Sequence, residues 1–249
     1  MAQIIYGIHP VEEALKSPNV EVEKILLGQR RSVSALQPLL DLARKRGVPV
    51  LTVSNEALTE MAGGGVHQSV VAFLKEIPYA NLHEILQRWR EKREKALFVV
   101  LDGIQDPHNL GALIRTALGC GAHGLIIPKD RAVGMTPTVV KASAGATAHL
   151  PVARVTNLAT TIEELKHEGL WVFGAAAEAK DRIYELDFTV DLAVVIGAEG
   201  KGMRPLVKKK CDRLFFVPMK GPMTSFNASV CGGMILYEVM RQRHLSMKG

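Results

Sequence analysis

From residue 96 onward, short apolar runs alternate with longer amphipathic stretches. The short runs are rich in valine, isoleucine and leucine, and they predict strands over 97–101, 125–127, 171–173, 192–196 and 214–217. The longer stretches carry apolar residues at helical spacing and predict helices over 109–120, 158–168 and 227–243. Because strands and helices alternate, we expect an α/β domain whose mostly parallel sheet is covered by helices on both faces.

The first 75 residues have a separate pattern that predicts a small α/β unit. Strand-like runs lie at 22–27, 48–53 and 70–74, with a helical stretch over 34–46. Residues 76–95 keep only a weak apolar stripe and end in an almost wholly charged run, which is typical of a partly helical connector. We therefore expect a small N-terminal α/β domain over 1–75, a connector over 76–95 and a larger domain over 96–249.

The predicted strand 192–196 opens directly into a loop that contains Gly197, Gly200 and Gly202. Glycine lets backbone amides approach a ligand closely, so the loop predicts a binding site. Its spacing differs from the G-x-G-x-x-G dinucleotide fingerprint, and Lys201 lacks the following Ser or Thr of a phosphate loop. The loop is therefore suited to an uncharged base or ribose, with Glu199 available to orient it.

The predicted helix over 109–120 has two different faces. A buried stripe is predicted for Leu110, Leu113, Ile114, Ala117 and Leu118. Arg115 lies off this stripe, above small residues, so a ligand or partner could dock against its guanidinium. An ordinary exposed helix arginine is the alternative, and Asn109 could equally be a helix N-cap.

The last predicted helix opens with Ser225, Asn227 and Ser229 and continues through Gly232 and Gly233. Each glycine weakens a helix by about 1 kcal/mol relative to alanine, so a compensating close approach of a ligand or a helix is expected. This block, the glycine loop and the block at Asn109 each lie at a predicted strand-to-helix junction. Together they predict a cofactor cleft beside a polar reaction centre.

Charge and cysteine content narrow the class of protein. The formal charge of +6 and the recurring basic clusters favour a polyanionic partner such as nucleic acid, although a solvated helix face explains any single cluster. No run of about eighteen apolar residues appears, and the first residues lack the pattern of a signal peptide. The three cysteines have no metal-binding spacing. We expect a cytoplasmic protein with reduced thiols, no membrane contact and no metal.

Three motifs of the chain resemble the SpoU branch of the SPOUT RNA methyltransferases. They are Asn109-Leu110-Gly111-x-x-x-Arg115-Thr116-Ala117, Ile196-Gly197-Ala198-Glu199-Gly200 and Ser225-x-Asn227-x-Ser229. The segments Tyr6-Gly7-Ile8-His9-Pro10-Val11 and Val66-His67-Gln68 are similar to the substrate-binding extension of RlmB-like members. These members methylate a guanosine ribose 2′-OH in large-subunit (23S) ribosomal RNA. The alternatives within the family are methyltransferases of tRNA ribose and resistance-type ribosomal RNA methyltransferases.

The resemblance implies an S-adenosyl-L-methionine site in a deep trefoil knot, an N-terminal RNA-binding domain and a homodimer. It implies that the cofactor pocket is lined by Gly197, Ala198, Gly200, Val217, Met219, Ser225 and Phe226. It implies that the catalytic centre contains Asn109, Arg115, Glu199, Asn227 and Ser229. A guanidinium gives up its proton only at very high pH, so we expect Arg115 to stabilise the forming alkoxide rather than to act as a simple base.

Overall fold

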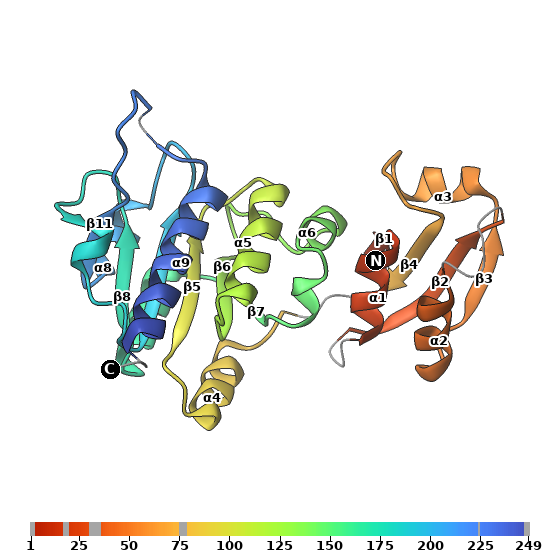
Figure 1. Ribbon diagram of the computed structural model, residues 1–249, viewed down its shortest axis with the longest axis horizontal. Coiled ribbons are helices and arrows are strands. Elements are labelled where there is room, and N and C mark those ends of the chain that lie inside the picture. The colour runs from red at the N-terminus through yellow and green to blue at the C-terminus, as the bar shows by residue number, and fades with distance from the viewer. Residues whose placement is uncertain (1–2, 17–19, 30–35, 75–78, 224, 247–249) are drawn as a thin grey trace. The chain divides into compact units, whose positions relative to one another are not determined.

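The computed structural model describes residues 3–16, 20–29, 36–74, 79–223 and 225–246 (Figure 1). Its internal packing divides the chain into two compact units. The first unit combines residues 1–78 with residues 135–149, and the second combines residues 79–134 with residues 150–249.

A four-stranded mixed sheet forms the centre of the first unit, in the order β1-β4-β2-β3. Strand β4 runs antiparallel to β1 and β2, whereas β2 and β3 are parallel. The elements are β1 (Gln3–Tyr6), α1 (Ile8–Lys16), β2 (Val22–Gly28), α2 (Gln37–Lys45), β3 (Val50–Val53), α3 (Asn55–Met61) and β4 (Val70–Leu74). The sequence predicted β2, α2, β3 and β4; positions 34 and 35 of its helix lie outside the described residues. It missed β1, α1 and α3.

Residues 135–149 add α6 (Pro137–Ala142) and the short helix η2 (Ala146–Ala148) to the first unit. Val140 and Ala148 share a core with Ile5 and Val11. A Cβ atom on Gly145 would overlap the side chain of Glu13, so glycine is needed for this close approach. The predicted domain limits placed this segment in the larger domain. In the structure this segment packs with the first unit instead, because its apolar residues are buried against α1 and the small sheet.

The second unit contains a parallel seven-stranded sheet in the order β7-β6-β5-β10-β8-β11-β9. Its strands are β5 (Leu97–Asp102), β6 (Gly124–Pro128), β7 (Val152–Val155), β8 (Trp171–Ala175), β9 (Asp181–Arg182), β10 (Leu192–Gly197) and β11 (Arg213–Phe216). The predicted α/β class and parallel sheet are confirmed. The sequence missed β7 and β9, each of which has at most four residues.

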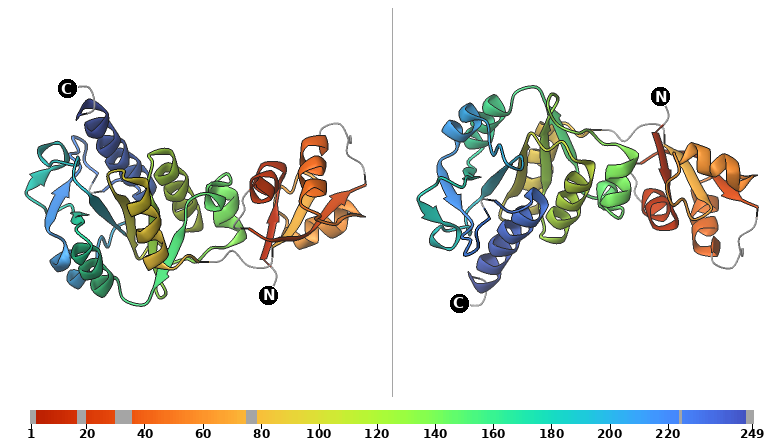
Figure 2. Two further views of the ribbon diagram at one scale, coloured as in Figure 1. Left: turned by 90° about the horizontal axis from the view of Figure 1, so that it is seen from below. Right: turned by 90° about the horizontal axis from the view of Figure 1, so that it is seen from above.

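Helices cover both faces of this sheet (Figure 2). They are α4 (Leu82–Lys92), α5 (Pro107–Gly119), α7 (Leu158–His167), α8 (Pro205–Lys210) and α9 (Ala228–Ser246). One core joins α4, α7 and α8 to side chains of the sheet such as Phe98 and Val195. Helices α5 and α9 pack together on the opposite face. No helix in the described part of the chain is both long and apolar enough to span a membrane.

The contact between α5 and α9 depends on one of the two neighbouring glycines of α9. A Cβ atom on Gly232 would overlap Leu113 and approach Ile196, whereas a Cβ atom on Gly233 would meet nothing within 4 Å. The first glycine therefore permits close helix packing, which is one of the two alternatives that the sequence left open. Within the described chain the second glycine has no such close neighbour.

Substitution of these two glycines by alanine should change the free energy of unfolding in opposite directions. We expect Gly232→Ala to lower the free energy of unfolding by about 1–3 kcal/mol, because the added methyl group overpacks a buried contact. Within its own chain Gly233→Ala should raise it by up to about 1 kcal/mol, since alanine is the better helix former and its Cβ atom meets nothing there within 4 Å. Urea unfolding of both variants at one protein concentration measures the difference. Equal losses in both would contradict the packing described.

Candidate active site

The glycine loop after β10 folds back on itself. Ala198 and Gly202 form an antiparallel bridge, with the Gly202 amide donating to the Ala198 carbonyl at 2.8 Å. Gly200 and Gly202 have φ angles of 73° and 64°, a region that favours glycine. A Cβ atom on Gly197 would overlap the backbone of Gly202 and Met203. The tight fold therefore requires glycine at the start of the loop.

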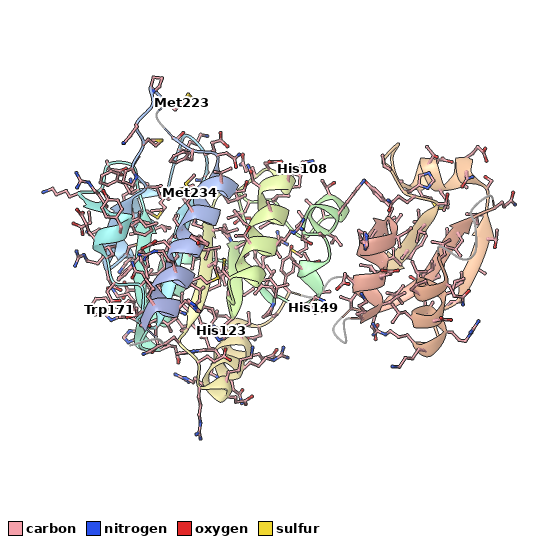
Figure 3. The ribbon with its side chains drawn as sticks, viewed as in Figure 1. His108, His123, His149, Trp171, Met223 and Met234 are labelled. Carbon is pink, nitrogen blue, oxygen red and sulfur yellow. The ribbon has the colours of Figure 1, made fainter. Side chains whose placement is uncertain are left out.

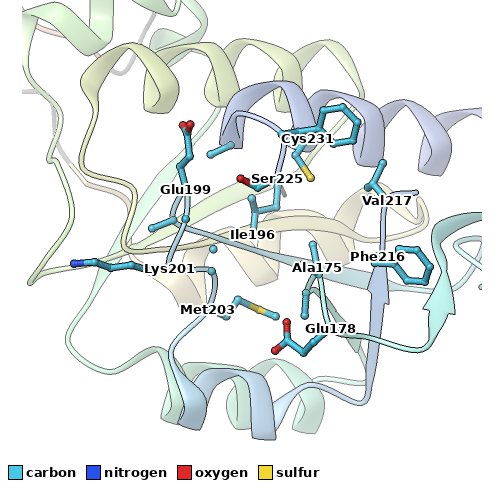
Figure 4. Close-up of a pocket in the computed structure, with 18 of the residues that line it drawn as sticks. Ala175, Glu178, Ile196, Glu199, Lys201, Met203, Phe216, Val217, Ser225 and Cys231 are labelled. Carbon is cyan, nitrogen blue, oxygen red and sulfur yellow. The ribbon is translucent and has the colours of Figure 1, made fainter. Parts of the chain in front are cut away.

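This loop forms one wall of a cavity of about 510 Å³ at the carboxyl ends of β10, β8 and β11. All seven residues that the family resemblance assigned to the cofactor pocket line this cavity: Gly197, Ala198, Gly200, Val217, Met219, Ser225 and Phe226. Figure 4 shows Ser225 and Cys231 on the side of α9, with Ala175, Met203 and Glu178 on the other side. The lining is mostly apolar or backbone, with a few polar side chains, as in small-molecule sites generally.

Asn227 links the glycine loop to the start of α9. Its amide nitrogen donates to Glu199 Oε2 at 3.1 Å, while its Oδ1 accepts from the backbone N–H of Ser229 at 2.9 Å and from the Ser229 hydroxyl at 2.7 Å. Asn227 therefore caps the helix and holds the Glu199 carboxylate at the same time. Three of the five predicted catalytic residues form this one hydrogen-bonded group.

A second cavity of about 360 Å³ shares the glycine-loop wall, including Ala198 and Glu199, with the first. Asn109 lines this second cavity. The N-cap of α5 is Asp106, whose carboxylate accepts from the amides of His108 and Asn109. The capping role considered for Asn109 thus falls to Asp106. The Asn109 side chain is available to the cavity it lines.

Arg115 lies on the exposed side of α5. The predicted apolar stripe is buried at Leu110, Leu113, Ile114 and Ala117, and Leu118 is half-buried. Arg115 is not among the residues that line either cavity. None of the described hydrogen bonds joins Arg115 to the group formed by Glu199, Asn227 and Ser229. Asn227 and Ser229 do not line either cavity themselves, and within this group only Glu199 does.

Sequence reasoning missed the buried contact that closes the glycine loop. Asp102 ends β5 and is only 1% exposed. Its carboxylate accepts from the Arg204 backbone N–H at 2.7 Å and from Arg204 Nε at 2.6 Å. The position of Asp102 directly after the apolar run 97–101 was the available sign of a functional residue. No sequence pattern marked its partner Arg204, which lies 102 positions later.

Two titrating groups of the first cavity have perturbed pKa values. Burial raises the pKa of the Cys231 thiol, so this group is protonated and slow to react at neutral pH. A hydrogen bond from Lys208 lowers the pKa of Glu178, which keeps that carboxylate charged at the edge of the cavity. Among the described residues, no three His, Cys, Asp or Glu side chains are grouped to hold a metal ion.

The fold and the cavities define an α/β protein with a small-molecule site at the carboxyl ends of parallel strands. Residues 96–237 match the SpoU rRNA Methylase family, and residues 4–80 match the model described as RNA 2′-O ribose methyltransferase substrate binding. The chain belongs to the SpoU methylase family. This confirms the family predicted from the three motifs.

Relatives of the chain match it over nearly its whole length. It is 46% identical to a putative TrmH family tRNA/rRNA methyltransferase of Bacillus subtilis, over 96% of each chain. It is 42% identical to the 23S rRNA (guanosine-2′-O-)-methyltransferase of Coxiella burnetii, over 96% of this chain and 95% of that one. The crystal structure of the SpoU methyltransferase AviRb from Streptomyces viridochromogenes with AdoMet superposes with a TM-score of 0.82 at 26% identity. That match covers 99% of this chain and 91% of AviRb.

Proposed function

We propose that this protein transfers a methyl group from S-adenosylmethionine to a guanosine ribose 2′-OH in 23S ribosomal RNA. The observation that carries the proposal is the first cavity, because the glycine loop and the segment leading into α9 together line it. The nearly full-length match to a ribosomal RNA guanosine methyltransferase supports the substrate. The N-terminal match to a substrate-binding model supports RNA as the partner.

The residues of the first cavity fit S-adenosylmethionine. The volume of this cavity, about 510 Å³, lies within the usual range of about 300–1,000 Å³ for small-ligand sites. The loop from Gly197 supplies backbone groups for the adenosine part, and Phe226 and Val217 supply apolar contact. When bound, S-adenosylmethionine supplies a methyl group that is already activated by the positively charged sulfur.

The chain's own residues then have to orient the ribose and stabilise the oxygen that loses its proton. Glu199 lines both cavities and is held by Asn227, so it can accept a hydrogen bond from the ribose. Asn109 offers an amide to the nucleotide from the second cavity. Arg115 supplies the positive charge that favours the alkoxide. Since Arg115 lies outside the cavities of its own chain, we propose that it acts on the site of a second subunit.

A homodimer formed through α9 would provide that second subunit. Val230, Met234 and Tyr237 recur at helical spacing and are 49%, 40% and 59% exposed. Figure 3 shows Met234 on the outward side of α9. An exposed apolar stripe of this kind is typical of a protein interface. Because α5 packs beside α9, a dimer through α9 also brings the two copies of α5 into the interface region.

Tyr237→Glu tests the proposed dimer. A charge placed in the centre of a buried apolar interface should shift the protein from dimer to monomer at micromolar concentration. Sedimentation velocity measures the shift, and Leu51→Glu is the control because Leu51 is an apolar residue that is 52% exposed on β3 of the first unit. Two variants that both stay dimeric, or a monomeric wild type, would overturn this interface.

We further propose that the protein works in the cytoplasm, that the N-terminal unit supplies RNA affinity and that the methyltransferase domain contains a deep trefoil knot. Basic residues recur along the chain, which suits a phosphate backbone. Membership of the SpoU family leads us to propose the knot.

Mapping methylated riboses in RNA from a deletion strain and its parent tests the activity and its substrate. We expect one ribose-methylated guanosine of 23S rRNA to be lost in the deletion strain. Expression of the wild-type protein should restore it, whereas Gly197→Ala should not. Loss of a methylated tRNA ribose instead would favour the tRNA-modifying relatives. Unchanged RNA would overturn the proposal.

A further inference from the structure

The second cavity lies where the order of the parallel sheet reverses. From β5 the chain moves through β6 to β7 on one side, whereas β10 and its neighbours lie on the other. Helix α5 follows β5 on one face, and α8 follows β10 on the opposite face. This divergence opens a crevice at the carboxyl ends of β5 and β10, which is the usual ligand position in such sheets. Asp102 and Gly197 are direct neighbours across these two ends.

The walls of the second cavity are built for a polar ligand. Polar side chains that line it include Gln105, Asn109, Asp130, Arg131, Glu199 and Arg204. The first cavity, in contrast, is enclosed mainly by the glycine loop and apolar residues. A methyl donor and its acceptor need adjoining sites, and the two cavities share the wall at Ala198 and Glu199.

Arg204 is the positively charged group of this cavity that the structure fixes most firmly. Its Nε and backbone N–H both donate to the buried Asp102 carboxylate. Its side chain remains 42% exposed, and the described contacts give no partner to its two terminal nitrogens. Arg131, in contrast, is exposed and has no such anchor among the described contacts. A guanidinium held at Nε keeps a planar fork of donors free for a ligand.

We propose that the second cavity receives the base of the acceptor nucleotide and that Arg204, positioned by Asp102, reads guanine through its O6 and N7 atoms. The inference rests on the proposed function and adds the group that selects the base. Guanine offers two adjacent acceptors on this edge, which match an arginine fork. Adenine offers N7 together with an amino group, so one arm of the fork would face another donor. Gln105 and Asp130 supply acceptors for the N–H groups of guanine.

Removal of the N7 acceptor from the substrate tests this contact. Wild-type protein should methylate the target RNA fragment at least about tenfold more efficiently, by kcat/KM, than the same fragment with 7-deazaguanosine at the target. Arg204→Met keeps an unbranched apolar stem but removes the donors of the guanidinium. The ratio of kcat/KM for guanosine to kcat/KM for 7-deazaguanosine should therefore fall to about twofold or less in this variant. Asp102→Asn should reduce this ratio partly, because Arg204 keeps its charge and loses its anchor.

Arg213→Ala is the matched control for these variants. Arg213 also donates to an aspartate, Asp181, at 2.6 Å, but it lines neither cavity. The Arg213→Ala variant should therefore show the same loss of kcat/KM on 7-deazaguanosine as the wild-type protein. Comparing two substrates within each variant separates base reading from general loss of stability, and calorimetry with S-adenosylmethionine confirms that each variant still forms the first cavity.

Saturation-transfer NMR with GMP and 7-deaza-GMP gives a second readout that needs no methyl transfer. Wild type and Arg213→Ala should contact GMP more strongly than 7-deaza-GMP, and Arg204→Met should contact both equally. If the wild-type protein prefers GMP over 7-deaza-GMP but methylates no RNA, the proposed function is wrong and the inference about guanine reading still holds. Methylation with an unchanged loss of kcat/KM on 7-deazaguanosine in Arg204→Met would overturn the inference alone.

Discussion

Replacing Gly197 by alanine is expected to lower the affinity for S-adenosylmethionine by about 5- to 150-fold. The added Cβ atom would overlap backbone atoms of Gly202 and Met203 rather than the flexible end of a side chain. The loop must therefore open, and the strain of about 1–3 kcal/mol expected for overpacking reduces binding by that factor. Isothermal titration calorimetry with S-adenosylmethionine measures the change.

Gly119→Ala is the control for the same chemical change. Gly119 ends α5, and a Cβ atom there would meet nothing within 4 Å. This variant should bind S-adenosylmethionine with wild-type affinity. If Gly197→Ala also binds normally while remaining folded by circular dichroism, the tight glycine loop is not what shapes the cofactor site.

Arg115→Ala is expected to lower kcat for RNA methylation by at least about 100- to 1,000-fold, while the affinity for S-adenosylmethionine stays within about twofold. The size of the expected decrease in kcat follows from the loss of a preorganised charge that stabilises the forming oxyanion. The unchanged cofactor affinity follows from the position of Arg115 outside both cavities. Single-turnover transfer of a labelled methyl group measures kcat, and Arg115→Lys should recover little because the planar fork is lost.

Mixed dimers show which subunit uses Arg115. At a cofactor concentration well below the dissociation constant of Gly197→Ala, neither this variant nor Arg115→Ala should be active alone. If Arg115 acts on the second subunit, their mixed dimer contains one complete site, formed by the Arg115→Ala cofactor pocket and the arginine of the Gly197→Ala subunit. Activity should then return to a substantial fraction of wild type. A mixed dimer as inactive as both parents would show that each arginine serves its own chain, and turnover in Arg115→Ala alone would exclude the role altogether.

The sequence predicted most strands of the large sheet and the glycine loop because those signals are local, whereas the set of residues expected at the cofactor pocket came from the family resemblance. A run of β-branched residues followed by Gly197 carries both the strand and the loop in a few positions. The same holds for the predicted buried stripe of α5, where only Leu118 is half-buried. In contrast, β9 has only two residues, the short run of β7 is interrupted by the exposed Arg154, and α6 belongs to the first unit only through long-range packing.

The parts that escaped prediction depend on pairing between distant segments. β5 and β10 are neighbours in the sheet although about ninety residues separate them. Asp102 and Arg204 come together only because β5 and β10 pair. The hydrogen bond between them therefore cannot be predicted from a local sequence pattern. The placement of Arg115 shows the same limit. Its exposed face was predictable from helical spacing, but only the fold shows that Arg115 lines neither cavity.

Calorimetric titration of the wild-type protein with S-adenosylmethionine tests the central claim most directly, namely that the cavity bounded by the glycine loop holds a methyl donor. We predict saturable binding of one molecule per chain, lost or strongly weakened in Gly197→Ala and retained in Arg115→Ala. Absence of binding by the folded wild-type protein would contradict the account.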